Sequence, residues 1–267
     1  MIKVRLIPCL LLREGILVKS YQFNRFLPVG NPLTAIQFFN TWAVDEIIFL
    51  NITPKKAYRP GRLDNNLKEF QSLADYTRYI SKHCFVPLTV GGGINTIRSM
   101  GTLFKAGADK ISLNTAVYRR PKLLKEAAEK FGRQALVVSI DVKQNPSGYE
   151  VVTNYGQEAT GKNPVEWAKT VENLGAGEIL LNCIDRDGMM TGYDLKLIRT
   201  VVDAVDIPVI ACGGVGKWQD LVDGVKKSHA AAVAAGNIFH FSEQSTKKAK
   251  DYLDSAGINV RQSGFVH

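Results

Sequence analysis

The sequence predicts an α/β fold, a closed (β/α)8 barrel of the TIM-barrel class built from two half-barrel repeats. Eight β-rich apolar runs alternate with helical patterns, and 267 residues is a usual length for such a barrel. A Pro-led run that stops at a glycine cluster occurs at Val86–Gly93 and again at Ile207–Gly214, a little under half the chain apart. A repeat at that spacing indicates a doubled architecture. We therefore expect one domain over residues 1–267, with half-repeats of about 1–130 and 131–267.

The predicted strands are continuous apolar runs, which is typical of strands buried on both faces of a parallel sheet. In chain order they are Val4–Leu10, Glu46–Ile52, Val86–Val90, Lys110–Leu113, Ala135–Asp141, Glu178–Ile184, Val209–Ala211 and Ala231–Ala234. A helix is expected after each, with helix starts at Asn31-Pro32, Thr96, Pro121, Pro164 and Ser245. An open doubly wound sheet is the alternative, but no G-x-G-x-x-G follows the first strand.

Two stretches interrupt this regular alternation. Residues 13–30 are expected to form a long loop after the first strand, and loops of that length are usually functional or mobile. Residues 148–155 alternate in polarity after the fifth strand, which indicates a small hairpin. Both would lie at the carboxyl ends of the strands, where barrel active sites are built.

Composition and charge favour a soluble cytoplasmic protein. The chain is 45% hydrophobic, has no apolar run of the roughly 18 residues that span a bilayer, and shows no signal peptide at its start. The net charge is +9, but the lysine pairs are scattered, so we expect a solvated surface rather than a nucleic-acid face. The four cysteines form no C-x-x-C pair and the histidines show no metal spacing. We expect free thiols, no metal and no cofactor.

The glycine clusters after the third and seventh predicted strands are candidate phosphate sites. Glycine lets backbone N–H groups approach an anion closely, and a helix N-terminus adds a favourable dipole. Each cluster has a neighbour one strand further on. The candidate phosphate-binding residues are Gly92, Gly93, Asn114, Thr115, Gly213, Gly214, Ala235 and Gly236. Tight turns alone would explain a single cluster, but two equivalent clusters indicate a ligand with a phosphate at each end.

Carboxylates at the strand ends are candidate acids or bases. Asp141 ends the fifth strand, and Asp185 and Asp187 follow the sixth. A carboxylate at the carboxyl end of a barrel strand is more often catalytic than structural. The position equivalent to Asp141 on the first strand is Leu11, so that half of the barrel has no carboxylate there.

Four charged residues are expected at the opposite, amino-terminal mouth of the barrel. Arg5, Glu46, Lys110 and Glu178 start the first, second, fourth and sixth strands. Two positive and two negative charges in a closed ring would satisfy one another. Such a ring is either a structural plug of salt bridges or a gate on a passage through the barrel.

Six motifs together resemble one family. They are Arg5–Leu10, Asp45–Leu50, Thr89–Ile94, Gly107–Thr115, Gly175–Leu181 and Ile184–Gly188. They are similar to the cyclase subunits of imidazole glycerol phosphate synthase, over nearly the whole chain. The resemblance implies a half-repeat barrel that binds a ribonucleotide with two phosphates. It also implies a glutaminase partner on the amino-terminal mouth, whose ammonia crosses the charged ring and travels up the barrel.

The chain departs from that family's pattern at its catalytic end. The family uses two aspartates as general acid and base; Asp141 matches the second, whereas Leu11 stands where the motif C-L-D has the first. Asn51 replaces a usual Asp and Ser20 a usual Gly, while Lys19 in the expected loop is kept. We place Lys19, Asn51, Asp185 and Asp187 in the substrate pocket. Because leucine cannot transfer a proton, efficient cyclisation is not expected.

These departures leave three hypotheses. In the first, the chain channels ammonia from a glutaminase to a separate sugar amidotransferase that makes acetamidino sugars for surface polysaccharides, as paralogs of the family are thought to do. In the second, it is a slow cyclase of histidine biosynthesis that relies on Asp141. In the third, it is a non-catalytic scaffold for the glutaminase. Neither nucleic acid nor membrane is an expected partner.

Overall fold

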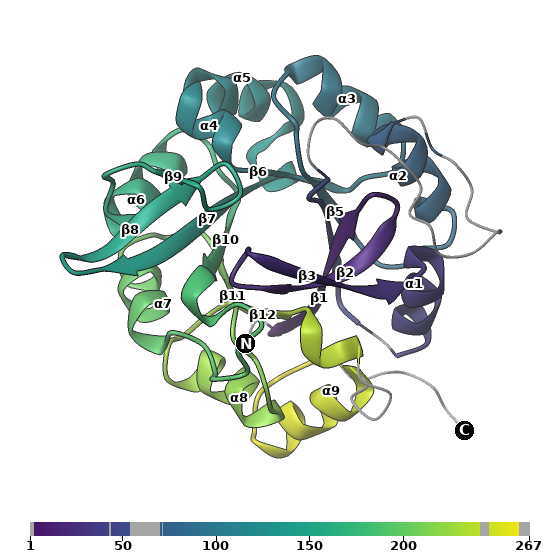
Figure 1. The fold of residues 1–267 in the computed structure, drawn as a ribbon, viewed down its shortest axis with the longest axis vertical. Helices are drawn as coiled ribbons and strands as arrows, with labels where there is room; N and C mark the ends of the chain where they lie inside the picture. Colours follow the sequence, from purple (N-terminus) through teal and green to yellow (C-terminus); the bar gives the residue numbers. More distant parts are fainter. Residues whose placement is uncertain (1–2, 43, 54–69, 71, 241–245, 262–267) are drawn as a thin grey trace.

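The computed structural model describes residues 3–42, 44–53, 70, 72–240 and 246–261, and these form a closed barrel of eight parallel strands (Figure 1). The barrel strands are β1 (Arg5–Arg13), β4 (Ile47–Asn51), β5 (Leu88–Gly91), β6 (Lys110–Leu113), β7 (Leu136–Asn145), β10 (Glu178–Cys183), β11 (Val209–Cys212) and β12 (Ala232–Ala235). The pairing of β7 with β10 and of β12 with β1 closes the sheet. The predicted barrel is therefore confirmed, and the open doubly wound sheet is wrong.

Helices surround the barrel in Figure 1. They are α1 (Pro32–Thr41), α2 (Leu73–Ser81), α3 (Ile97–Lys105), α4 (Thr115–Arg119), α5 (Lys122–Phe131), α6 (Pro164–Asn173), α7 (Leu195–Val202), α8 (Trp218–Lys226) and α9 (Thr246–Ser255). Short 3-10 turns also occur at Arg133–Ala135, Ile184–Arg186 and Asn237–His240. No helix in the described part of the chain is both long and apolar enough to cross a membrane.

The predicted helix starts follow the rules of helix capping. The side chain of Asn31 accepts the backbone N–H of Leu33 at 2.8 Å, just ahead of the first-turn Pro32. Thr96 and Ser99 form a reciprocal capping box at the start of α3. Pro121 and Pro164 also begin helices as expected, whereas Ser245 lies outside the described residues.

The barrel interior holds its own small apolar cluster, separate from the larger core between strands and helices. Its buried members are Ile7, Cys9, Ile48, Val137, Leu180, Ile210, Ala232 and Ala234. Leu11, Leu50 and Cys212 pack against this cluster. Side chains on a strand alternate between its two faces, so Leu11 shares the inner face of β1 with Ile7 and Cys9, as Asp141 shares that of β7 with Val137.

Residues 13–30 are not the long loop that the sequence predicted. They form an antiparallel hairpin of β2 (Ile16–Tyr21) and β3 (Arg25–Gly30), and β2 also pairs with the end of β1. Leu17 and Val18 are buried, which stabilises the hairpin. In Figure 1 this hairpin crosses the barrel opening. Residues 148–153 form the single strand β8 (Gly148–Thr153), which pairs antiparallel with the end of β7 and with β9 (Glu158–Ala159). Antiparallel pairing after the fifth barrel strand is therefore confirmed, but it extends beyond the expected residues 148–155 on both sides.

Candidate functional site

Asp141 lies at the carboxyl-end mouth of the barrel and is the best candidate there for acid–base chemistry. It is only 8% exposed. Asn114 Nδ2 donates to Asp141 Oδ2 at 2.7 Å, and Ser139 Oγ donates to Oδ1 at 3.5 Å. Burial raises the pKa of Asp141 to about 7 against the hydrogen bond from Asn114, and the negative charge of Asp187 adds to the rise. A carboxyl group with such a pKa can take up or release a proton near neutral pH.

Leu11 occupies the matching position on the other half of the barrel. Leu11 pairs in register with Leu50 of β4, whereas Asp141 pairs in register with Asn182 of β10. Leu11 and Leu50 pack on the inner apolar cluster. At the carboxyl-end mouth, Leu11 and Leu50 therefore present apolar side chains at the positions where Asp141 and Asn182 present a carboxyl and an amide.

Asp185 and Asp187 follow β10 but play different parts. Asp185 is exposed, and its Oδ2 accepts the backbone N–H of Gln144 at 2.7 Å on the β7–β8 hairpin. Asp187 turns inward, and burial raises its pKa. Hydrogen bonds from the Ser20 side chain and the backbone of Phe23 act against that rise in pKa. The structure thus brings Asp187, and not Asp185, toward Asp141.

Two of the glycines after β5 and β11 are required by backbone crowding. Gly92 has φ +106° and a Cβ there would lie 2.0 Å from the carbonyl oxygen of Asn51. Gly214 has φ +110° and a Cβ would lie 2.2 Å from the carbonyl oxygen of Gly192. Gly213 is also in the left-handed region, whereas a Cβ on Gly93 would meet nothing within 4 Å. Tight packing accounts for part of each cluster, and phosphate binding stays a prediction.

The helix starts beside the two glycine clusters differ in their capping. The carboxylate of Asp220 accepts the backbone N–H groups of Gly216 at 2.9 Å and Lys217 at 3.0 Å before α8. At α3 the corresponding capping groups are the neutral hydroxyls of Thr96 and Ser99. Because the start of α8 already holds a carboxylate of its own chain, an added anion would be repelled there more than at the start of α3.

The other predicted mouth residues are tied to the two hairpins. Thr115 Oγ1 accepts the backbone N–H of Asn154 at 3.0 Å, in the β8–β9 turn. Gly236 approaches the carbonyl oxygen of Cys9 so closely that a Cβ would lie 3.0 Å from it, and Ala235 ends β12. Asn51 Oδ1 accepts the backbone N–H of Thr53 at 3.1 Å.

Lys19 lies on β2, in the hairpin at the carboxyl-end mouth, and its charge acts on His240 after β12. Burial lowers the pKa of His240 to about 4, and the positive charge of Lys19 contributes to that decrease. Lys19 therefore lies near the turn that follows β12, on the side where a phosphate was predicted.

Four charged residues at the amino-terminal mouth form a closed ring. Arg5 contacts Glu46 at 2.7 Å and Glu178 at 2.5 Å, and Lys110 contacts each of the same glutamates at 2.9 Å. Thr89 Oγ1 also donates to Glu46 at 2.6 Å. Burial alone would raise the pKa of Glu178, but the hydrogen bonds and charges of Arg5 and Lys110 hold it below the ordinary value. The structure brings the four together, while their role as a gate stays a prediction.

A family model described as "Histidine biosynthesis protein" matches residues 5–245. The chain belongs to this family. The match runs from the first residue of the charged ring to beyond β12, so it includes both half-barrels and both mouths. The matched part of the chain therefore includes Asp141, Leu11 and the four ring residues.

Sequence reasoning missed several residues at the carboxyl-end mouth of this family member. Ser139 and Asn182 contribute to the surroundings of Asp141, and Asn237 donates to the carbonyl oxygen of Ser20 at 2.9 Å. Strand parity could have found Ser139, two residues before Asp141. Asn182 needed the register of β7 with β10, which only the structure gives. No three His, Cys, Asp or Glu side chains in the described ranges are grouped as a metal site.

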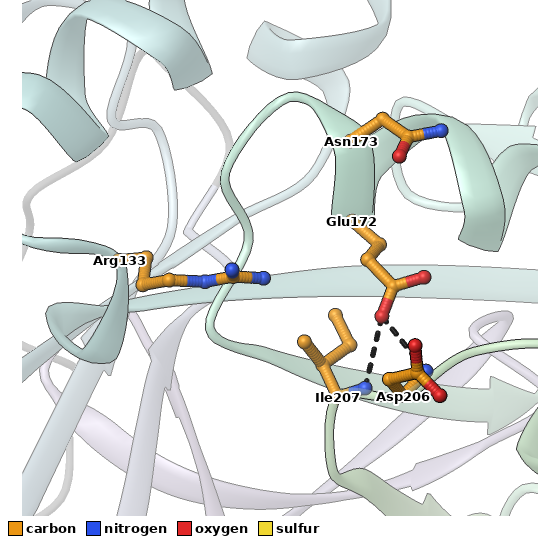
Figure 2. Close-up of a pocket in the computed structure, with 5 residues that line it drawn as sticks. All are labelled: Arg133, Glu172, Asn173, Asp206 and Ile207. Atoms are coloured by element: carbon orange, nitrogen blue, oxygen red, sulfur yellow. Dashed lines mark hydrogen bonds between the residues drawn. The ribbon is translucent and has the colours of Figure 1, made fainter.

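A separate hollow of about 520 Å³ lies among the segments that precede β7, β10 and β11, away from the carboxyl-end mouth, and Figure 2 shows its lining. Its lining comes from the turn before β7, the end of α6 and the segment before β11. The lining residues are Arg133, Glu172, Asn173, Asp206 and Ile207. Glu172 Oε1 accepts the backbone N–H groups of Asp206 at 2.8 Å and Ile207 at 3.0 Å. The only carboxylate contacts drawn in this hollow are therefore loop-stabilising ones.

Proposed function

We propose that this histidine biosynthesis family member is the ammonia-channelling synthase subunit of a glutamine amidotransferase. It delivers ammonia for the amidination of a sugar in the biosynthesis of acetamidino sugars for surface polysaccharides. The observation that carries the proposal is the contrast between the two barrel mouths. The charged ring of Arg5, Glu46, Lys110 and Glu178 is complete, whereas Leu11, at the position on β1 equivalent to Asp141 on β7, supplies no second acid–base carboxyl.

The ring can open without leaving a charge unpaired. Each glutamate contacts two cations, so Lys110 can leave Glu178 while Arg5 still pairs with it. An uncompensated buried charge is costly, and this shared pairing avoids that cost during opening. A small neutral molecule such as ammonia then has an entrance to the barrel interior.

The amino-terminal face also presents apolar side chains that suit a protein partner. Phe85 is 82% exposed and Phe38 is 52% exposed. Asn40 fixes this arrangement, since its side chain donates to the carbonyl of His83 and accepts the N–H of Phe85 at 3.1 Å. Large exposed aromatic side chains near the end of α1 and on the loop before β5 fit docking of a glutaminase. The sugar amidotransferase would take up ammonia at the opposite mouth.

The proposal is tested with the bisphosphorylated ribonucleotide used by imidazole glycerol phosphate synthase and with ammonium as nitrogen source. We expect no turnover at ordinary enzymatic rates by the natural chain, because Leu11 transfers no proton. Leu11→Asp is expected to gain turnover if the pocket still accommodates that ligand. Leu50→Asp is the matched control, since it places a carboxyl on the neighbouring strand of the same mouth.

A second candidate function is that of a genuine cyclase with weakened acid–base catalysis. The raised pKa of Asp141, about 7, favours it, since one carboxyl group is already poised for proton transfer. Turnover of the bisphosphate by the natural chain at ordinary rates would support the cyclase and contradict ammonia delivery to a sugar. The scaffold hypothesis predicts no binding of phosphorylated ligands, which calorimetry with the same bisphosphate measures.

A further inference from the structure

Lys250 of α9 and Asp45, in the segment before β4, form an ion pair that is almost completely buried. Lys250 Nζ lies 2.7 Å from Asp45 Oδ1, and the two side chains are 5% and 7% exposed. The same ammonium donates to the carbonyl oxygen of Arg261 at 3.1 Å. Burial lowers the pKa of Lys250, and the hydrogen bond and charge of Asp45 act against that decrease. A buried ion pair adds little net stability compared with apolar residues of similar volume, so a positional role is the better explanation of this one.

Asp45 fixes the start of β1 beside the charged ring. Its Oδ2 accepts the backbone N–H of Leu6 at 2.9 Å, and its own backbone N–H donates to the carbonyl oxygen of Leu6 at 3.3 Å. Leu6 directly follows Arg5, and Asp45 directly precedes Glu46. Arg5 and Glu46 contact each other in the ring at 2.7 Å. The carboxylate that Lys250 holds is therefore attached to the chain next to both partners of this ring contact.

The segment after α9 holds the chain on the other side of Arg5. The backbone N–H of Val4, which precedes Arg5, donates to the carbonyl oxygen of Asn259 at 2.8 Å. Lys250 binds the same segment through the carbonyl oxygen of Arg261. The residues on both sides of Arg5 are therefore attached either to a carboxylate or to a segment that Lys250 contacts.

The other glutamate of the ring is held in a different way. Glu178 follows Gly177, whose backbone N–H donates to the carbonyl oxygen of Leu136 at 3.0 Å. A Cβ on Gly177 would lie 2.1 Å from the carbonyl oxygen of Arg133. Close backbone packing therefore fixes the start of β10, whereas side-chain charges help to fix the starts of β1 and β4.

We propose that Lys250 is a positioning residue for the charged ring, which holds Arg5 and Glu46 in the geometry of their ion pair through Asp45 and the segment after α9. The helix α9 then forms part of the amino-terminal mouth, although it supplies no ring residue. The importance of this geometry for ammonia entry rests on the proposed function. The positioning itself is independent of it.

The positioning is tested by solvent exchange of the Arg5 guanidinium protons, measured by NMR on the full chain labelled at arginine. Lys250→Met is expected to accelerate this exchange by about tenfold, because a less firmly held contact with Glu46 opens more often. Lys250→Arg, which keeps the positive charge, is expected to retain most of the protection. Leu253→Ala is the matched control, because it removes a fully buried side chain of the same helix and lowers stability but leaves the ion pair in place. Its Arg5 exchange is expected to change by less than about twofold.

Two outcomes would overturn the positioning. One is Arg5 exchange in folded Lys250→Met that is as slow as in the natural chain, and the other is an equal acceleration by Leu253→Ala. If Lys250→Met does not fold, the double variant Asp45→Asn/Lys250→Met takes its place, since it leaves no buried charge unpaired and keeps an oxygen acceptor for the N–H of Leu6. The same acceleration of about tenfold is expected there, and unchanged exchange would contradict the proposal.

The link to ammonia entry is measured separately, in the assembled complex with a glutaminase. In Lys250→Met, transfer of nitrogen from glutamine is expected to fall relative to transfer from added ammonium, because the entrance to the barrel is no longer held in its paired geometry. An unchanged ratio, with accelerated Arg5 exchange in the same variant, would leave the positioning intact and contradict only the gate role in the proposed function.

Discussion

Asp141 is a single residue whose burial should make the protein less stable at higher pH. Its folded pKa of about 7 lies above the ordinary value of 3.8, so the folded state binds the proton more tightly than the unfolded chain. The free energy of unfolding therefore falls as pH rises from about 4 to about 7. Asp141→Asn keeps an acceptor for Asn114 but has no charge to bury. We expect the variant to be more stable than the natural chain at about pH 8, by up to about 4 kcal/mol.

Urea denaturation of both proteins across this pH range measures the difference. The gain is expected to shrink as pH falls below about 7 and to vanish near pH 4, where the natural carboxyl is protonated in both states. Asp185→Asn serves as control, because that side chain is exposed. A constant difference at all pH values would show that burial of charge at Asp141 is not its cause.

At the residue scale, sequence reasoning found groups that end strands and missed groups that depend on register. Asp141 was identified from its place after an apolar run. Asn182 was not, because only the pairing of β7 with β10 puts it beside Asp141. The inward turn of Asp187 and outward position of Asp185 depend on backbone contacts with residues far away in sequence, which no local pattern contains.

Two adjacent glycines in the loop after β5 allow a matched test of crowding. Gly92 and Gly93 both have positive φ, but only a Cβ on Gly92 would meet backbone, at 2.0 Å from the Asn51 oxygen. Gly93→Ala is expected to cost about 1–2 kcal/mol from conformation alone. Gly92→Ala carries that cost and must also displace β4, so we expect a loss of more than about 3 kcal/mol. Thermal and urea denaturation of the two variants give the comparison, and equal losses would contradict it.

At the element scale, periodicity predicted the barrel strands well because buried parallel strands are apolar throughout. The hairpin at residues 16–30 was not predicted, because the segment mixes Lys19 and Ser20 with apolar residues. Its turn also uses Gln22 and Phe23 at φ 52° and 57°, rather than Gly or Asn. Turns at positive φ are ordinarily recognised by Gly or Asn. The β8–β9 hairpin was easier to predict, since Gly148 begins an alternating run.

The whole molecule joins two chemically different mouths through one apolar interior. The four charged residues at the amino-terminal mouth pair with one another. The inner apolar cluster of the barrel, which includes Ile7 and Leu180, carries no charged side chain. The carboxyl-end mouth holds carboxyls with raised pKa values. Sequence placed each group at the correct end, because the start and end of a parallel strand decide the mouth. The ion pairs among the four charged residues could not be predicted from the sequence, because they depend on how β1, β4, β6 and β10 are arranged around the barrel.

Glu178→Gln tests whether the ring acts as a gate or only as a plug. The variant leaves Arg5 and Lys110 with Glu46 as their shared carboxylate, so we expect a loss of about 3 kcal/mol in the free energy of unfolding at neutral pH. The pKa of Glu178 is lowered by folding, so its contribution is present above an ordinary glutamate pKa and is lost as pH falls through the folded value. The difference between variant and natural chain should therefore decrease in acid. Glu126→Gln, in an exposed pair with Arg120, is expected to cost less than about 1 kcal/mol.

The same variant separates stability from ammonia passage in the assembled complex with a glutaminase. If the ring is a gate, Glu178→Gln reduces transfer of glutamine nitrogen to the acceptor, while added ammonium, which reaches the carboxyl-end mouth from solvent, still supports the reaction. The ratio of the two rates is unaffected by a general loss of folded protein, because both rates scale with the amount of intact complex. Glutamine coupling that stays intact in the variant, with the expected loss of stability present, would mean that the four charges only hold the amino-terminal end of the barrel together.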